Sequence, residues 1–395
     1  MTLPHGPDPL ARELRLPCGA VIRNRIAKAA TSEGLATGHA SPTSRHVRLY
    51  DRWGSSGAGL VITGNVAIDR RHLVAPGDVA LDGPHPAFAE WARAVTRHGA
   101  HAFLQLNHPG RQAPRKLVPE PVAPSKVRVR RGGPLAFGIP RALGELEIRS
   151  IIERFAFSAG LARDAGFTGV EIHAAHGYLI GQFLSARTNR RTDAWGGSPE
   201  RRRRFLVEVL RAVRREVGPR FPIAVKLNSS DFLRGGFDDD ASIAVVRTLE
   251  AEGVDLVEIS GGTYEVDVVL GRRQGSRGGP YFGDYQARLA SIAGVPTIAT
   301  GGHRDVGVMR EEIASERASI IGLARPMIHH PELPARVLRG EGIPSLPRPP
   351  RFGLRLTDAP MELGWYSEHI RALADGRPPA VTSAQSVGRI VARFV

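Results

Sequence analysis

The sequence of 395 residues predicts a single (β/α)8 barrel. Apolar, β-branched segments of strand length occur eight times, and segments with the apolar spacing of helices lie between them. The strand segments are nearly continuous apolar runs, which is typical of parallel strands buried on both faces. This alternation favours a closed parallel barrel over an open sheet, and barrel chains often exceed about 250 residues.

The elements follow one another in a regular order. The expected strands are residues 25–31, 59–68, 101–108, 169–175, 222–230, 255–262, 296–302 and 318–326, and the expected helices include 84–97, 145–165, 199–216, 239–252, 305–316 and 331–339. Ser198 suits the N-cap of its helix, with Pro199 in the first turn and Glu200 at the positive end of the dipole. No Gly-x-Gly-x-x-Gly follows the first strand, so a Rossmann domain is not indicated.

Two segments lie outside the alternation. Residues 109–144, rich in Pro, Gly and Arg, are too long for an ordinary loop, and we expect them on the catalytic rim as a lid or small hairpin. Residues 345–395 begin as a Pro-rich linker and then contain PMELGWYSEHIRALADG, which predicts a helix packed on the barrel or on a neighbouring subunit. We therefore divide the chain into a barrel, residues 1–344, and an extension, residues 345–395. A homo-oligomer is expected, with the tail near Trp365 a candidate contact.

Composition narrows the classes of function. Cys18 is the only cysteine, which excludes an internal disulfide and a four-cysteine iron–sulfur cluster. No apolar run approaches the ~18 residues that span a bilayer, and the N-terminus lacks a secretory signal, so we expect a cytoplasmic protein. The formal charge of +15 would suit nucleic acid or a phosphorylated ligand, but the arginines are scattered. The one dense run, Arg201–Arg204, is typical of a solvated helix face.

Polar residues gather where the predicted strands end. In a parallel barrel the C-terminal strand ends form the active-site rim, so these residues are expected to meet there. The set comprises Ser32, Gly64, Asn65, Gln105, His108, His173, His176, Tyr178, Lys226, Gly261, Gly262, Gly301, Gly302 and Arg325. Core packing alone does not explain such a collection.

The fourth strand and the residues after it carry a specific motif. The segment GFTGVEIHAAHGYLIGQFLSARTNRRTDAWGGSPERRRRF resembles the signature of the Old Yellow Enzyme (NADH:flavin oxidoreductase) family. NRIAKAATSEG, GAGLVITGNVAID, FLQLNHPGRQ, AVKLNSSDF, VEISGG, IATGG and IGLARPMIHHP match in the same order, over roughly residues 10–340. The resemblance implies an FMN-binding barrel that takes electrons from NADH or NADPH.

The resemblance assigns His173, His176 and Tyr178 to the substrate. The two histidines would donate hydrogen bonds to the oxygen of an enone or phenol, and Tyr178 would protonate the substrate carbon. Residues i and i+3 of a strand face opposite sides, so both imidazoles reach one ligand only where the chain leaves the sheet. A structural histidine pair, a tyrosine in lid contacts and, least favoured, a zinc site are the alternatives.

The resemblance also assigns residues to the flavin. Lys226 would stand beside flavin N1, where the family more often has arginine, and Gln105 would bind the pyrimidine edge. A salt bridge to a rim carboxylate and a buried amide bonded to backbone are the respective alternatives. The remaining predicted cofactor contacts are Ala29, Ala30, Thr31, Ser32, Asn65, Gly301, Gly302, Ala324 and Arg325, the last four around the phosphate. Gly301 and Gly302 could instead form only a tight turn.

These assignments predict an ene-reductase-like cycle. NAD(P)H would reduce FMN, and an α,β-unsaturated carbonyl would then accept hydride from flavin N5. Ser32 stands where the family often has threonine or cysteine, and Glu33 faces either substrate or solvent, so the substrate is less well specified than the cofactor. A dehydrogenase or a reductase acting on a specialised biosynthetic intermediate is the first alternative. A basic binding protein without enzymatic activity is the second.

Overall fold

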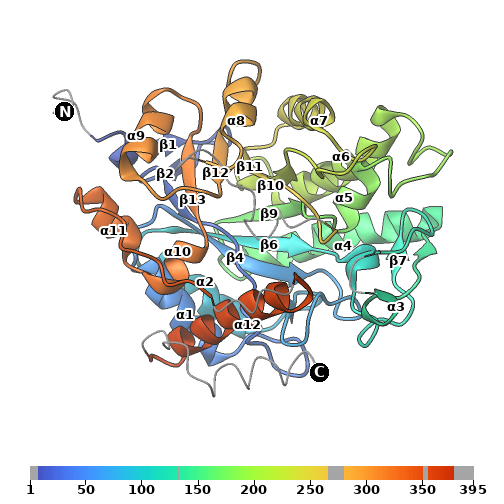
Figure 1. Cartoon of the computed structure of the whole chain (residues 1–395), viewed down its shortest axis with the longest axis horizontal. Helices are drawn as coiled ribbons and strands as arrows, with labels where there is room; N and C mark the ends of the chain where they lie inside the picture. Colours follow the sequence, from blue (N-terminus) through green and yellow to red (C-terminus); the bar gives the residue numbers. More distant parts are fainter. Residues whose placement is uncertain (1–7, 131–132, 266–279, 350–354, 378–395) are drawn as a thin grey trace.

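Eight short parallel strands form the centre of the molecule, and helices surround them (Figure 1). The computed structural model describes residues 8–130, 133–265, 280–349 and 355–377. Nearly all strand residues are buried because helices cover the outer face and side chains fill the inside. The strands are β3 (Ile26–Lys28), β4 (Leu60–Ala67), β6 (His101–Asn107), β9 (Gly169–Ala174), β10 (Ile223–Asn228), β11 (Leu256–Ser260), β12 (Thr297–Thr300) and β13 (Ile320–Leu323).

Pairing between the first and last strands closes the ring. β13 pairs in parallel with β3, with Ile321 opposite Ile26, and β3 pairs in parallel with β4. Each of the eight predicted strand segments contains one of these strands, so the predicted (β/α)8 fold class is confirmed. A two-residue strand, β5 (Val79–Ala80), adds in parallel to β4 outside the ring.

Each of the six predicted helix segments corresponds to one helix of the structure. The matching helices are α2 (Ala87–Thr96), α4 (Glu145–Asp164), α6 (Pro199–Val217), α7 (Asp239–Ala251), α9 (Val306–Ala314) and α11 (Leu333–Leu338). Ser198 caps α6 by accepting a hydrogen bond from the Arg201 amide. Outside the predicted segments lie α1 (Ser44–Gly54), α5 (Leu179–Leu184), α8 (Gly283–Ala290) and α10 (Arg325–His329). α5 and α10 are too short to show a helical period.

An antiparallel hairpin covers the end of the barrel where the strands begin. It consists of β1 (Leu14–Arg15) and β2 (Val21–Ile22). Its buried side chains join the inward-facing residues of the strands in one apolar cluster, which we call the lower core. The lower core comprises Leu14, Leu16, Ile22, Ala27, Leu60, Ile62, Phe103, Ala224, Leu256, Ile298 and Ile320.

The segment 109–144 contains four short elements. They are η2 (Gly110–Gln112), β7 (Val122–Ala123), α3 (Gly133–Ala136) and β8 (Arg141–Ala142). β7 and β8 pair in parallel, so the small hairpin proposed from the sequence is wrong. The long connection between the two strands allows the second to run in the same direction as the first, which a tight turn would not.

The tail helix α12 (Arg355–Ala374) packs against α1 and α10 of the same chain, and Figure 1 shows it in red across these two helices. Trp365 is only 2% exposed, and its ring lies 4.9 Å from that of His329. A surface contact through Trp365 itself is therefore not available. The division at residue 344 stays a prediction. Within the described ranges, no helix is long and apolar enough to cross a membrane.

Candidate active site

The inside of the barrel changes from apolar to polar towards the C-terminal strand ends. Gln105, Glu171, Lys226 and Glu258, here called the polar layer, are each at most 3% exposed. Alternate residues of a strand face the same side. Gln105, Lys226 and Glu258 thus stand one step above Phe103, Ala224 and Leu256 of the lower core.

His173 lies one inward step beyond Glu171 on β9, opposite Lys226 of β10, and His176 lies beside it. His176 has φ +58° and Gly177 has φ +73°, so the chain leaves the sheet in the left-handed region and turns back. His176 Nδ1 comes to 3.2 Å from His173 Nε2. The amide of His176 donates to Asn228 Oδ1 at 3.1 Å, which anchors this turn to β10. The structure therefore brings the two predicted imidazoles into one place.

The hydrogen bonds around the imidazoles assign their protons. The Ala175 amide donates to His173 Nδ1, so a neutral His173 carries its proton on Nε2 and donates to His176 Nδ1. His176 then donates from Nε2 to Ser260 Oγ at 2.8 Å. Burial and, next, the charge of His176 lower the pKa of His173 well below its ordinary value; burial and Lys226 lower the pKa of His176 to about 3. Both rings are neutral at physiological pH.

Tyr178 completes the group. Its ring lies 4.8 Å from that of His173 and almost perpendicular to it, and its hydroxyl is 2.6 Å from the hydroxyl of Tyr264. Burial, followed by the contact with Tyr264, raises the pKa of Tyr178 well above its ordinary value. The phenol therefore keeps its proton at neutral pH. Tyr264, in the loop after β11, was not predicted; the only sequence signal was a tyrosine two residues past Gly262.

Lys226 points into the barrel and binds a carboxylate there. Its Nζ lies 2.6 Å from Glu258 Oε1, and the two side chains are 4% and 0% exposed. Lys226 thus forms a salt bridge, as the alternative interpretation of the sequence proposed. The carboxylate that it binds belongs to a barrel strand and not to the rim. Glu171 contacts the same carboxylate: burial first, then the charge of Glu258, raise the pKa of Glu171 well above its ordinary value.

Gln105 and Asn65 lie on neighbouring strands. Gln105 Nε2 donates to Glu171 Oε2 at 2.5 Å, so its partner is a side chain and not the backbone suggested as the alternative. Asn65 Oδ1 accepts from Asn107 Nδ2 at 3.2 Å, and Asn65 Nδ2 lies 3.5 Å from the exposed Ser32 Oγ. Asn65 and Gln105 are register partners in the pairing of β4 with β6.

The residues that follow β3 differ in their exposure to solvent. Ala29 is buried and its amide pairs with Leu323 O, while Ala30, Thr31 and Ser32 are at least partly exposed. Glu33 is not solvated, although solvation was one of the two expectations for it. It is buried, accepts from the Gly64 amide at 2.8 Å and is hydrogen-bonded to the Tyr50 hydroxyl.

Lys28, which no sequence argument singled out, is buried near Glu33. Its Nζ donates to Thr31 Oγ1 at 2.9 Å and lies 4.0 Å from the centre of the Trp53 ring. Burial lowers the pKa of Lys28 to about 7. Because Trp53 belongs to α1, this lysine lies on the helix side of β3, outside the polar layer.

Glycines and arginines mark the ends of β12 and β13. Gly301 and Gly302 have φ +111° and +90°, which favours glycine at both positions. A Cβ on Gly301 would come within 2.9 Å of the Tyr281 ring. Ala324 caps α10 and Arg325 begins it. Arg325 Nη1 lies 3.2 Å from Glu362 of α12.

Arg304 joins this group, although the sequence analysis missed it. Partial burial and then the charge of Arg325 lower the pKa of Arg304. Arg304 Nη1 donates to the carbonyl of His303 at 3.0 Å. Guanidinium groups next to backbone amides at glycines are suited to a phosphate. The signal available was an arginine two residues after Gly302.

Two other residues that were predicted at strand ends, His108 and Gly261, support the structure around the site. His108 packs its ring 4.7 Å from that of His72 and accepts from the Gly110 amide, so it supports the start of segment 109–144. A Cβ on Gly261 would come within 2.7 Å of the Phe282 ring. Gly261 thus permits close packing.

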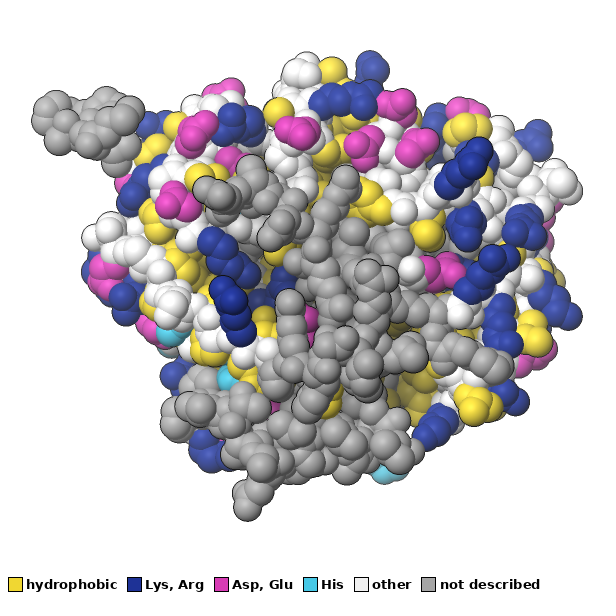
Figure 2. Space-filling view, viewed as in Figure 1, with side chains coloured by type: hydrophobic (Ala, Val, Ile, Leu, Met, Phe, Trp, Pro, Cys, Tyr) yellow, Lys and Arg dark blue, Asp and Glu magenta, His cyan; other side chains and the backbone are white. Residues whose placement is uncertain are grey.

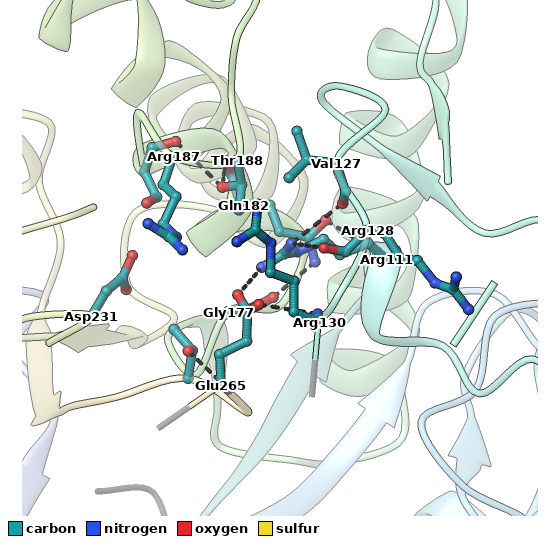
Figure 3. Close-up of polar contacts among 12 residues, drawn as sticks. Arg111, Val127, Arg128, Arg130, Gly177, Gln182, Arg187, Thr188, Asp231 and Glu265 are labelled. Carbon is teal, nitrogen blue, oxygen red and sulfur yellow. Dashed lines mark hydrogen bonds and ion pairs between the residues drawn. The ribbon is translucent and has the colours of Figure 1, made fainter. Parts of the chain in front are cut away.

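An ion pair joins the rim segments beside Tyr264 (Figure 3). Arg111 Nη2 donates to Glu265 Oε2 at 2.8 Å, and Arg111 Nη1 donates to the carbonyls of Val127 and Arg128. The Arg111 side chain is 3% exposed. Because Glu265 follows Tyr264 directly, this clamp fixes the second tyrosine against segment 109–144.

Basic side chains on the described part of the visible face lie among acidic ones (Figure 2). Figure 2 shows Lys and Arg side chains all around the visible face, with acidic side chains between them. In the run Arg201–Arg204, Arg203 and Arg204 pair with Glu200 and Glu208 along α6. Across the described residues, no cluster of three or more His, Cys, Asp or Glu side chains is placed to hold a metal ion.

The residues present fit the FMN that the sequence resemblance implies. An amide and an ammonium group inside the barrel suit the carbonyl-rich edge of an isoalloxazine. The arginine pair and glycine amides at β12 and β13 suit its phosphate.

Comparisons with known proteins identify relatives of this chain. The chain is 39% identical over 355 residues to the NADH-dependent flavin oxidoreductase iliE of Hypocrea jecorina (strain QM6a), covering 82% of this chain and 88% of that protein. It is 36% identical over 382 residues to iliE of Neonectria sp. (strain DH2), covering 89% of this chain but 49% of that protein, so it spans about half of that relative.

A solved structure shows the same architecture. The old yellow enzyme homologue from Zymomonas mobilis aligns with a TM-score of 0.72 and 25% identity, covering 85% of this chain and 94% of that one. Residues 19–342 match the model of the NADH:flavin oxidoreductase / NADH oxidase family. The expected cofactor FMN and electron donor NAD(P)H are supported by these relatives. The chain therefore belongs to the NADH:flavin oxidoreductase family, which includes the Old Yellow Enzymes.

Proposed function

We propose that this flavin oxidoreductase reduces the activated C=C bond of an α,β-unsaturated carbonyl, in two half-reactions that share one site. The observation that carries the proposal is the pair of neutral imidazoles, 3.2 Å apart, with a protonated phenol beside them. Two hydrogen-bond donors and one acid are the groups that a polarised enone requires. FMN, when bound, supplies the hydride.

The protein would hold and polarise the substrate. An enone oxygen between the imidazoles replaces their mutual hydrogen bond and accepts from His173 Nε2. His176 donates from Nδ1 once its proton leaves Nε2, and Ser260, whose hydroxyl can donate or accept, then donates to Nε2. The β-carbon gains the hydride and Tyr178 gives its hydroxyl proton to the α-carbon, so the saturated carbonyl has gained two hydrogens.

Other residues would hold the cofactor. Gln105, Lys226 and Asn65 would contact the isoalloxazine, and residues 29–32 would lie along its edge. Gly301, Gly302, Ala324 and Arg325 would bind the phosphate, and Arg304 extends this set. A cytoplasmic location and a homo-oligomer stay predictions.

Anaerobic titration tests the proposal. The purified protein is reduced with one equivalent of NADH or NADPH and then titrated with 2-cyclohexenone, while flavin absorbance is recorded. We expect the enone to restore the oxidised spectrum and to yield cyclohexanone. A protein that binds FMN and accepts electrons from NAD(P)H, but that no enone reoxidises, would overturn the enone assignment.

Variants separate substrate polarisation from flavin reduction. We expect His173→Ala and His176→Ala each to slow reoxidation by enone about 10²–10³-fold, as for the loss of one oxyanion donor. Reduction of the flavin by NAD(P)H should change much less. The exposed His85→Ala is the matched control and should leave both steps unchanged. Equal losses in both half-reactions would indicate a structural histidine pair.

The first alternative keeps the flavin but changes the substrate. A dehydrogenase or a reductase of a specialised biosynthetic intermediate would use the same barrel and cofactor. Product analysis with matched saturated and unsaturated substrates, in the presence and absence of an electron acceptor, distinguishes these directions.

A further inference from the structure

Glu258 has no role in the steps described above, yet it forms the shortest contact that Lys226 makes inside the barrel. The two residues are direct partners in the pairing of β10 with β11, and Nζ and Oε1 are 2.6 Å apart. Both side chains are almost entirely buried. Because the carboxylate offsets part of the positive charge, a ligand near this ammonium group experiences a weaker positive potential than it would near an unpaired lysine.

The charges of the polar layer can be counted. Burial alone would raise the pKa of Glu258, but the charge of Lys226 and the hydrogen bond from Glu171 outweigh burial and hold this pKa below its ordinary value. Glu171 keeps its proton. The three side chains therefore carry one positive charge, one negative charge and one neutral acid, and their sum is zero.

A second cation, Lys28, lies outside the polar layer but interacts with its charges. Lys28 is also buried, but it faces Trp53 and Thr31 on the helix side of β3, and burial brings its pKa down to about 7. Glu258 makes its direct ion pair with Lys226, and Lys28 acts on the layer without such a contact.

We propose that Glu258 is a positioning residue that sets the reduction potential of the bound flavin by neutralising and orienting Lys226. The inference rests on the proposed placement of Lys226 beside the flavin. Reduction places negative charge on the isoalloxazine, which a lone ammonium group would stabilise strongly. The paired carboxylate cancels part of that stabilisation and keeps the flavin a better hydride donor. It also limits the directions in which Nζ can point.

The flavin midpoint potential is the measurement that separates this role from a structural one. Potentiometric titration of the FMN holoprotein, with a redox dye, is carried out on wild type, Glu258→Gln and Glu258→Asp. We expect Glu258→Gln to raise the midpoint potential, because it removes a negative charge and keeps the side-chain volume. Glu258→Asp keeps the charge and should stay close to wild type. A structural role alone would change FMN affinity or thermal stability at an unchanged potential.

A second pair of variants covers the case in which Glu258→Gln does not fold. Lys226→Gln removes the cation, and Lys226→Gln with Glu258→Gln removes both charges. The double variant should have the higher potential of the two and should lie near wild type. Equal potentials in this pair, or an unshifted potential in Glu258→Gln that still binds FMN, would overturn the inference. A colourless wild-type protein that takes up no FMN would instead overturn the proposed function.

Discussion

The two halves of the barrel interior are built from the same strands, but one half is apolar and the other is polar. In the lower core, Phe103, Ala224 and Leu256 are buried against the N-terminal hairpin. One inward position further along the same strands, Gln105, Lys226 and Glu258 are equally buried but polar. The backbone, the burial and the neighbouring strands are alike, so the side chains are what differs.

This difference separates stability from function. Burying an apolar side chain contributes about 1.5–3 kcal/mol relative to leaving it exposed. Burying an ion pair costs desolvation that its attraction only partly repays, and well-packed apolar residues often replace such a pair at no loss. The lower core therefore stabilises the barrel, whereas the polar layer is better explained by a charged or polar ligand above it.

The largest expected effect comes from breaking the Lys226–Glu258 pair. We expect Lys226→Met to lower the free energy of unfolding at pH 7 by about 3–5 kcal/mol, since Glu258 is left buried without its cation. Denaturant unfolding of the flavin-free protein measures this loss. Lys226→Met with Glu258→Leu should recover most of it while losing flavin binding. A double variant as unstable as the single one would show that the polar layer is needed for folding.

Truncating a side chain in the lower core should lower the stability of the protein and leave the flavin unaffected. Leu256→Ala, one inward position before Glu258, is expected to cost about 2–5 kcal/mol of unfolding free energy. The flavin midpoint potential should stay at its wild-type value because no charge changes. Ile298→Val is the milder control, with an expected loss of about 0.5–1.5 kcal/mol. A shift of potential in Leu256→Ala would mean that the two halves are mechanically coupled.

The same two halves show what the sequence can reveal. The eight strands were predictable because burial on both faces imposes continuous apolar runs such as those around Ile62 and Ile321. Residues at strand ends, His173 and Tyr178 among them, were predictable because barrel topology brings those ends together. Lys226 was noticed because a lysine inside a strand is costly.

Other features depend on contacts between distant segments. Glu258 and Glu171 lie within otherwise apolar strands, and their importance follows from facing Lys226, which a single sequence does not state. The burial of Glu33 could not be foreseen because its partner Tyr50 belongs to α1, a helix that was not predicted. Tyr264 is placed by the contact of Glu265 with Arg111, far away in sequence.

The protonation of Glu171 gives a prediction about pH. Its pKa is raised in the folded protein and ordinary, about 4.3, in the unfolded chain. Above pH 4 the folded state therefore holds more protons, and this group's contribution to stability falls as the pH rises. Glu171→Gln removes the proton linkage and keeps a donor for Glu258. We expect its stability relative to wild type to increase from pH 4 to pH 8, as measured by urea unfolding. An unchanged difference across this range would indicate an ionised Glu171.

The smallest expected effect concerns an ion pair outside the barrel and calibrates the one inside it. Arg211 Nη2 lies 2.5 Å from Glu252 Oε1, and the side chains are 49% and 22% exposed. Water screens such a pair, so Arg211→Gln should cost at most about 1 kcal/mol. In 1 M NaCl, where the screening length is about 3 Å, even this difference should vanish. The loss in Lys226→Met should persist at the same salt concentration, because no ions enter the polar layer. If salt reduced both losses equally, the interior pair would be open to solvent, and the contrast between the two halves of the barrel would have to be abandoned.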